Sequence, residues 1–203
     1  IVICRSNKRA NTHNNGIRNM ILDREGLLCS GDRIIIAKNN YFWTEQIKEM
    51  EFIANGDIAV IRRLRNIREL YGFQFADAQL EFSDYNDLEL EATILLDTLQ
   101  SESPALTQKE NERLYNKVME DYEDLSSQKE KLLALRKDAY FNALQVKYAY
   151  AVTCHKSQGG QWAHVYLDQG YMPKENLTSD YFHWLYTAFT RATEKLFLIN
   201  WPE

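Results

Sequence analysis

The fold is decided by one stretch, Tyr148 to Asp168, which reads YAYAVTCHKSQGGQWAHVYLD. An apolar segment rich in β-branched and aromatic residues leads into a polar turn, Thr153–Gln158, which we call the elbow. Gly159-Gly160 and a second apolar run follow. This order of strand, donor-rich turn and strand is typical of a parallel-sheet edge that holds a ligand. A second block, Trp184 to Ile199, reads WLYTAFTRATEKLFLI and predicts a helix followed by a buried strand. The two blocks together predict an α/β domain with a site.

Length and composition indicate a globular protein with one good-sized domain or two small ones. The chain has 203 residues, of which 45% are apolar and 26% charged. No apolar run approaches the ~18 residues of a membrane span, and no signal peptide is evident, so we expect no membrane partner. The three cysteines show no CxxC spacing, which favours a reducing, cytoplasmic location and argues against a zinc knuckle. Because the sequence opens inside a predicted strand without Met, we expect a fragment of a longer protein.

The net charge of −5 hides a segregation of charge along the chain. Residues 1–75 carry 12 Lys and Arg against 8 Asp and Glu, whereas residues 76–140 carry 7 against 16. Residues 141–203 are balanced, with 5 of each sign. The first part is therefore suited to face a polyanion, and the middle part would repel one.

The two ends of the chain show the same alternation of apolar strand-like segments and helical segments. Residues 1–4 and 33–38 predict buried strands, and the apolar positions of residues 10–22 predict a helix between them. That helix contains Gly16 and four asparagines, which are poor helix formers, so tertiary contacts must stabilise it. The same alternation of strand-like and helical segments returns after Asn142. We therefore predict one interrupted domain, formed by residues 1–40 and 142–203.

The interruption has two parts. Residues 41–100 predict a small β-barrel or meander, because short strand-like pieces at 62–70, 73–76, 78–82 and 89–95 are separated by turn residues. Ala54-Asn55-Gly56-Asp57 is predicted to be the hairpin turn between residues 51–53 and 58–61. Residues 101–141 are acidic and predict one or two amphipathic surface helices, packed on the domain rather than reserved for a partner.

The polar elbow carries the first candidate binding residues. Hydroxyl, imidazole, ammonium and amide donors within six residues suit the sugar-phosphate backbone of a nucleic acid, and Gly160 lets a backbone approach closely. A nucleophile–base pair of His155 and Ser157 is disfavoured because no GxSxG elbow surrounds the serine. The candidate donors are Thr153, His155, Lys156, Ser157 and Gln158.

Two arginines are further candidates. Arg191 ends an otherwise uncharged helical stretch, and Arg5 ends the first strand. For each, an internal salt bridge and a phosphate contact are both open. No glycine is followed by lysine, so the sequence lacks a GxxxxGK[ST] phosphate loop. Without that loop, Asp97 and Asp168, which end apolar runs, are interpreted as element ends rather than magnesium ligands.

Several segments together resemble superfamily 1 DNA helicases of the UvrD-like and RecD-like type, which include the exodeoxyribonuclease V alpha subunit. AYAVTCHKSQGGQW resembles motif V, WLYTAFTRATEKL resembles motif VI, and ICRSNKRANTHN resembles the motif IV region. GDRIIIAKNNYFW followed by FIANGDIAVI resembles the strand and SH3-like barrel that the 5′→3′ RecD-like branch inserts before motif V. The acidic segment 101–141 is outside this resemblance.

The resemblance implies the second RecA-like motor domain of an ATP-dependent helicase. Its parallel sheet is of the P-loop NTPase type but lacks its own phosphate loop, so ATP and Mg²⁺ would be held mainly by an N-terminal motor domain of the same protein. The isolated chain is then expected to be inactive. Single-stranded DNA is the implied substrate, in recombination or DNA repair, with repair-complex subunits as further partners.

The resemblance also implies roles for individual residues. Arg191 matches the arginine finger that reaches the γ-phosphate, and Arg5 matches a second phosphate sensor. Gln161, beside Gly160, stands where relatives often carry an acid that touches the nucleotide. The implied contacts to the DNA backbone are Thr153, His155, Ser157 and Gln158, with Lys156 as a weaker one.

Two other function classes were weighed. A non-catalytic module would use the barrel and the basic first part to hold nucleic acid or protein, and would bind DNA in a salt-sensitive way without any ATPase. A nuclease has little support, because the sequence shows no metal-binding carboxylate set.

Overall fold

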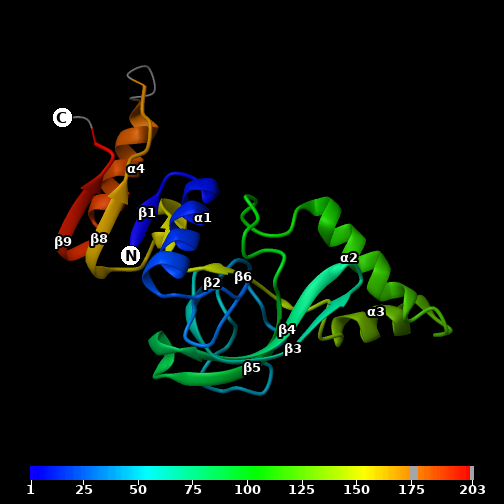
Figure 1. Ribbon diagram of the computed structural model, residues 1–203. Coiled ribbons are helices and arrows are strands. Elements are labelled where there is room, and N and C mark those ends of the chain that lie inside the picture. Colours follow the sequence, from blue (N-terminus) through cyan, green and yellow to red (C-terminus); the bar gives the residue numbers. More distant parts are fainter. Residues whose placement is uncertain (174–177, 202–203) are drawn as a thin grey trace. The chain divides into compact units, whose positions relative to one another are not determined.

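The computed structural model describes residues 1–173 and 178–201. The chain divides into two compact units. The sheet unit consists of Ile1–Glu25 and Tyr148–Glu203, and the barrel unit consists of Gly26–Lys147 (Figure 1). No helix among the described residues has both the length and the apolar character that crossing a bilayer requires.

The sheet unit is built on four parallel strands. Their order is β7-β1-β8-β9, and every neighbouring pair runs parallel. The strands are β7 (Ala151–Thr153), β1 (Val2–Cys4), β8 (Trp162–Asp168) and β9 (Ala192–Ile199). The predicted parallel α/β architecture is confirmed, and this arrangement fits a RecA-like domain.

Helices cover both faces of this sheet because the strand side chains alternate between them. Val2 and Cys4 of β1 form a buried cluster with Ala10 of helix α1 (Asn7–Gly16). Ile3 points to the other face and shares a cluster with Ala188 of helix α4 (Ser179–Phe189). The central strand is consequently buried on both sides, as its continuous apolar sequence predicts.

Helix α1 shows how a segment of poor helix formers is stabilised. It begins at the N-cap Ser6 and continues as a π-helical turn, Ile17–Ile21. Asn14 is buried, and its Oδ1 accepts hydrogen bonds from the N–H groups of Tyr150 and Ala151 while its Nδ2 donates to the carbonyl of Ala151. The tertiary contact that the sequence required is thus a side-chain clamp onto the start of β7.

The barrel unit contains a closed five-stranded barrel in the order β2-β3-β4-β5-β6. Its strands are β2 (Arg33–Ile36), β3 (Ile58–Leu70), β4 (Phe73–Phe82), β5 (Leu88–Leu95) and β6 (Leu144–Tyr148). The predicted barrel is present, but β2 and the first four residues of β6 belong to it, whereas the sequence analysis assigned them to the parallel sheet. Closure needs both strands, because β6 pairs in parallel with β5 and β2 pairs with β3.

Within the barrel, two local predictions were wrong. The turn expected at Ala54-Asn55-Gly56-Asp57 forms, since the Asp57 N–H donates to the Ala54 carbonyl at 3.1 Å, but its flanks do not pair as a hairpin. Instead, Ile53 bridges to Asn40, and β3 pairs with β2 and β4. The short pieces expected at 62–70, 73–76 and 78–82 are parts of two long strands. β3 is bent by two register shifts against β4, one of which contains Asn66 at a φ of +50°. Such bulges interrupt the alternating pattern that marks a strand.

The acidic segment forms two helices, as predicted. The helices are α2 (Gln108–Glu120) and α3 (Gln128–Arg136). A short 3₁₀ turn, η2 (Ser83–Tyr85), precedes them, between β4 and β5. Each begins with a reciprocal capping box, Thr107 with Glu110 and Ser127 with Glu130. The apolar faces of both helices join a core cluster with Phe73 and Phe75 of β4, so the helices pack on the barrel. The other buried members are Leu95, Leu106, Leu114, Val118, Leu135 and Ala143.

Candidate functional site

The polar elbow after β7 is a single 3₁₀ turn, η3 (Cys154–Ser157). Ser157 closes it: its hydroxyl donates to the carbonyl of Cys154 at 2.8 Å, and its own carbonyl accepts from the N–H of Gly160 at 3.2 Å. Ser157 is fully buried. Its hydroxyl therefore shapes the turn instead of facing outward, which differs from the role expected from the sequence.

The other elbow residues are presented to different degrees. His155 and Gln158 are exposed, and Thr153 is half-buried. Lys156 is also half-buried, and its burial lowers the pKa of the ammonium group to about 8. Because Lys156 is half-buried whereas His155 and Gln158 are exposed, His155 and Gln158 are the more accessible donors.

His155 and Gln158 line an open groove together with Arg5. The groove has a volume of about 770 Å³ and runs along α4. The guanidinium of Arg5 lies 5.8 Å from the ring centre of Tyr181 and 5.7 Å from that of Trp184. These ring faces hold a cation in place without neutralising it. The remaining lining residues are Cys154, Thr178, Asp180, His183 and Thr187.

Arg191 lies at the other end of α4. Its guanidinium donates to three neutral acceptors: the carbonyls of Thr187 (3.0 Å) and Gly160 (3.2 Å) and the hydroxyl of Thr190 (2.9 Å). Among the described residues, no carboxylate forms an ion pair with Arg191 or Arg5. Within residues 1–173 and 178–201, the internal salt bridge that the sequence left open is therefore absent for both arginines, and a phosphate contact stays open for each.

Gly160 connects the elbow to Arg191 through its carbonyl. A Cβ atom at Gly160 would collide with the indole of Trp162, so a side chain at this position would require that indole to move. The N–H of Trp162 in turn donates to the carbonyl of Arg191 at 2.9 Å. Gln161, between Gly160 and Trp162, is exposed. The structure thus brings Arg191, Gly160 and Gln161 together.

Arg5 and Arg191 are not brought together within this chain. Arg5 lies over Tyr181 in the first turn of α4, and Arg191 follows its last turn. An eleven-residue helix is about 16 Å long. If both arginines contact one ligand, that ligand must be extended along α4 or approach from outside the unit.

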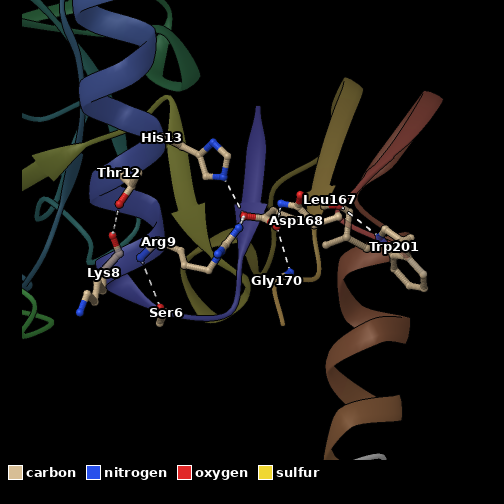
Figure 2. A network of polar contacts seen from close by, with 10 residues as sticks. Ser6, Lys8, Arg9, Thr12, His13, Leu167, Asp168, Gly170 and Trp201 are labelled. Atoms are coloured by element: carbon tan, nitrogen blue, oxygen red, sulfur yellow. Dashed lines mark hydrogen bonds and ion pairs between the residues drawn. The ribbon is translucent and has the colours of Figure 1, made fainter. Parts of the chain in front are cut away.

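A polar network centred on Asp168, which was not predicted from the sequence, lies within the sheet unit (Figure 2). The side chain of Asp168 is fully buried at the carboxyl end of β8. Its Oδ2 lies 2.7 Å from Arg9 Nε and 2.7 Å from His13 Nε2, both on α1. Its Oδ1 accepts from the N–H of Gly170 at 3.0 Å and from Asn200 Nδ2 at 2.9 Å. One carboxylate therefore ties together α1, the end of β8 and the end of β9.

The donors around Asp168 decide its ionisation. Burial raises the pKa of the carboxyl, but the hydrogen bonds from Asn200, His13, Arg9 and the Gly170 N–H outweigh burial and hold the pKa below its usual range. The available sequence signal was the pair Arg9 and His13 at i and i+4, which places two basic groups on one helix face.

The comparisons with known proteins follow this geometry. The UvrD-like helicase C-terminal domain model matches residues 148–199, which contain β7, the elbow, α4 and β9. This segment is similar to the C-terminal domain of UvrD-like helicases. Among solved structures, the Pif1 helicase from Candida albicans matches with 12% identity and a TM-score of 0.46. The match covers 99% of this chain and 44% of that chain, so the sequence spans less than half of its length. No curated protein matches.

Proposed function

We propose that this chain supplies the second RecA-like motor domain of an ATP-dependent DNA helicase. The observation that carries the proposal is the helicase-family match of residues 148–199, the segment whose fold joins the elbow to Arg191 through Gly160. The sequence has no phosphate loop, so ATP and Mg²⁺ are held mainly by another motor domain of the complete protein. When bound there, Mg²⁺ neutralises charge on the transferring phosphoryl group.

Arg191 acts in this proposal as the arginine finger. Its guanidinium is held by three neutral acceptors, which a γ-phosphate replaces with charge-assisted bonds. These bonds form only when the two motor domains close on ATP, so closure depends on the nucleotide. The backbone bond from the Trp162 N–H to the Arg191 carbonyl, which does not involve the guanidinium, then links this movement to the elbow. Arg5, held over two aromatic rings, is the candidate second sensor, and Gln161 is the candidate nucleotide contact.

Single-stranded DNA is the proposed ligand of the elbow. His155 and Gln158 are its accessible donors, Thr153 and Lys156 contribute from half-buried positions, and Ser157 holds the turn. A grip on the backbone, without reading of base edges, is what a sequence-indifferent motor needs. The barrel lies between the motif IV-like and motif V-like segments. This position favours the RecD-like branch, which inserts an SH3-like barrel there and moves along DNA in the 5′→3′ direction.

The activity is tested with the complete protein. We expect ATP hydrolysis that single-stranded DNA stimulates, and unwinding of a duplex with a 5′ single-stranded overhang. A duplex with a 3′ overhang tests the polarity. Unwinding of that substrate alone would contradict the RecD-like assignment but would still be consistent with a helicase. A complete protein that hydrolyses no ATP with or without DNA contradicts the helicase itself.

The DNA grip makes a separate prediction. In the complete protein, His155→Ala combined with Gln158→Ala is expected to weaken single-stranded DNA affinity about tenfold or more, because hydrogen bonds to a charged backbone are lost. Fluorescence anisotropy with a labelled oligothymidine measures this at fixed salt. His164→Ala, an exposed histidine on β8, is the control and should bind as wild type. Equal affinities for all three proteins would place the DNA elsewhere.

A second candidate function has one observation in its favour. The barrel carries a cleft of about 330 Å³ lined by Trp43, Arg63 and Arg65, together with the carboxylates of Asp77 and Glu91. Asp77 is neutralised by Arg68 at 2.7 Å, which leaves two exposed arginines beside an aromatic ring. For a non-catalytic binding module, Arg63→Ala with Arg65→Ala would abolish salt-sensitive DNA binding, and Arg191→Ala would change nothing measurable.

A further inference from the structure

We propose that Cys4, His13 and Asp168 form a binding site for a divalent transition metal of the zinc type, and that Arg9 competes with the ion for it. The three residues come from β1, α1 and β8, and each offers one ligand atom. All three atoms lie within 4.8 Å of one another. This inference is independent of the proposed helicase activity.

The distances suit a small ion after minor adjustment. His13 Nε2 and Asp168 Oδ2 are 2.7 Å apart. With metal–ligand bonds of roughly 2.0–2.3 Å, tetrahedral ligand atoms lie about 3.3–3.8 Å apart. Insertion of an ion therefore separates the imidazole from the carboxylate by less than about 1 Å and draws in the sulfur of Cys4. Rotations of three side chains provide this movement.

The donor set selects the class of metal. Thiolate, imidazole and carboxylate together suit Zn²⁺ and its neighbours, whereas Mg²⁺ and Ca²⁺ prefer an all-oxygen set. Three protein ligands leave a fourth position for water. The side chain of His13 is 27% exposed and provides access for the ion, while Cys4 is fully buried as the inner ligand.

Groups that are not themselves ligands already orient the Asp168 carboxylate, as outer-shell residues do in metal sites. Gly170 N–H and Asn200 Nδ2 hold Oδ1, so Oδ2 stays directed at His13. Such hydrogen bonds fix the geometry of a ligand and strengthen metal binding. Asp168 thus has one oxygen engaged in positioning and one shared by Arg9 and His13.

Arg9 is the competitor for that second oxygen. Its Nη2 lies 2.5 Å from Oδ2, where it supplies the positive charge that an ion would bring. The side chain of Arg9 is 41% exposed, so it can turn into solvent when an ion takes its place. Removal of the Arg9 side chain should consequently strengthen metal binding, whereas removal of a ligand should weaken it.

Binding also changes the state of Cys4. The ion replaces the thiol proton: the S–H bond breaks, a metal–sulfur bond forms, and one proton goes to solvent.

The test uses the 203-residue chain with Co²⁺ as a spectroscopic probe and Zn²⁺ as its competitor. We expect one Co²⁺ per chain, with a thiolate-to-cobalt charge-transfer band that Zn²⁺ removes. Cys4→Ser should abolish the band. His13→Ala should weaken binding by more than the roughly 10–100-fold that loss of an outer-shell partner costs. Cys29→Ser is the matched thiol control and should bind as wild type.

Arg9→Ala distinguishes a built site from adventitious metal binding. We expect this variant to bind Co²⁺ at least as tightly as wild type and to gain a larger Zn²⁺-dependent increase in melting temperature. Circular dichroism verifies that each variant is folded. A wild-type chain without the band, a band that survives Cys4→Ser, or one lost in Cys29→Ser would each overturn the site. Weaker binding by folded Arg9→Ala would overturn the competition.

Discussion

Arg191→Ala in the complete protein is expected to lower the rate of DNA-stimulated ATP hydrolysis by about 10³-fold or more, because an arginine finger contributes roughly 10³–10⁵ to phosphoryl transfer. Single-stranded DNA affinity should change little, since the DNA donors lie on the elbow. Arg191→Lys should restore little of the rate, because a lysine retains the charge but not the planar fork that makes several directed bonds.

The measurement is steady-state ATP hydrolysis at saturating oligonucleotide, with anisotropy of the same samples. Arg136→Ala, an exposed arginine at the end of α3, is the matched control for loss of one positive charge. Hydrolysis within a few-fold of wild type in Arg191→Ala would remove the finger assignment. Equal loss of DNA binding and hydrolysis would instead indicate that Arg191 supports the elbow through Gly160.

Much of the sheet unit was predictable because its signals are local. Buried parallel strands such as β1 read as apolar runs, and the segment from Trp184 combines an apolar helix with a strand. That strand, β9, was wrongly predicted to be buried: it lies at the edge of the sheet, and most of its residues are exposed or half-buried. The barrel was harder. An apolar run such as Arg33–Ile36 shows that a strand is buried but not which sheet it joins, so β2 and β6 were assigned to the wrong partners. The bulges in β3 further obscured its length.

The candidate site divides in the same way. The residue types of the elbow were readable, but which of them face outward depends on the 3₁₀ turn, and Ser157 is buried by it. The neutral partners of Arg191 come from its own helix and from Gly160. The contact with Gly160 could not be predicted, because no helical spacing rule relates these two residues in the sequence. Asp168 was interpreted as a strand end, because its partners lie more than 150 residues away on α1.

Asp168 carries the other large expected effect. Asp168→Asn should lower the free energy of unfolding of the sheet unit by about 2–4 kcal/mol, because it removes the charge at which Arg9, His13 and Asn200 converge. The value lies toward the lower end for a broken buried pair because Arg9 is partly exposed and regains water. Glu194→Gln, which removes a surface ion pair with His164 in the same unit, is the control and should cost about 0.5 kcal/mol or less.

The same residue predicts a pH dependence. Because the pKa of Asp168 is lower in the folded than in the unfolded protein, its stabilisation is complete above the unfolded value of about 4 and is lost as pH falls through the folded value. Three of the four tryptophans lie in the sheet unit, so fluorescence in a Trp43→Phe background follows its urea unfolding. The stability difference between wild type and Asp168→Asn should shrink as pH falls below that value. A constant difference would mean that the network acts through packing rather than through the carboxylate charge.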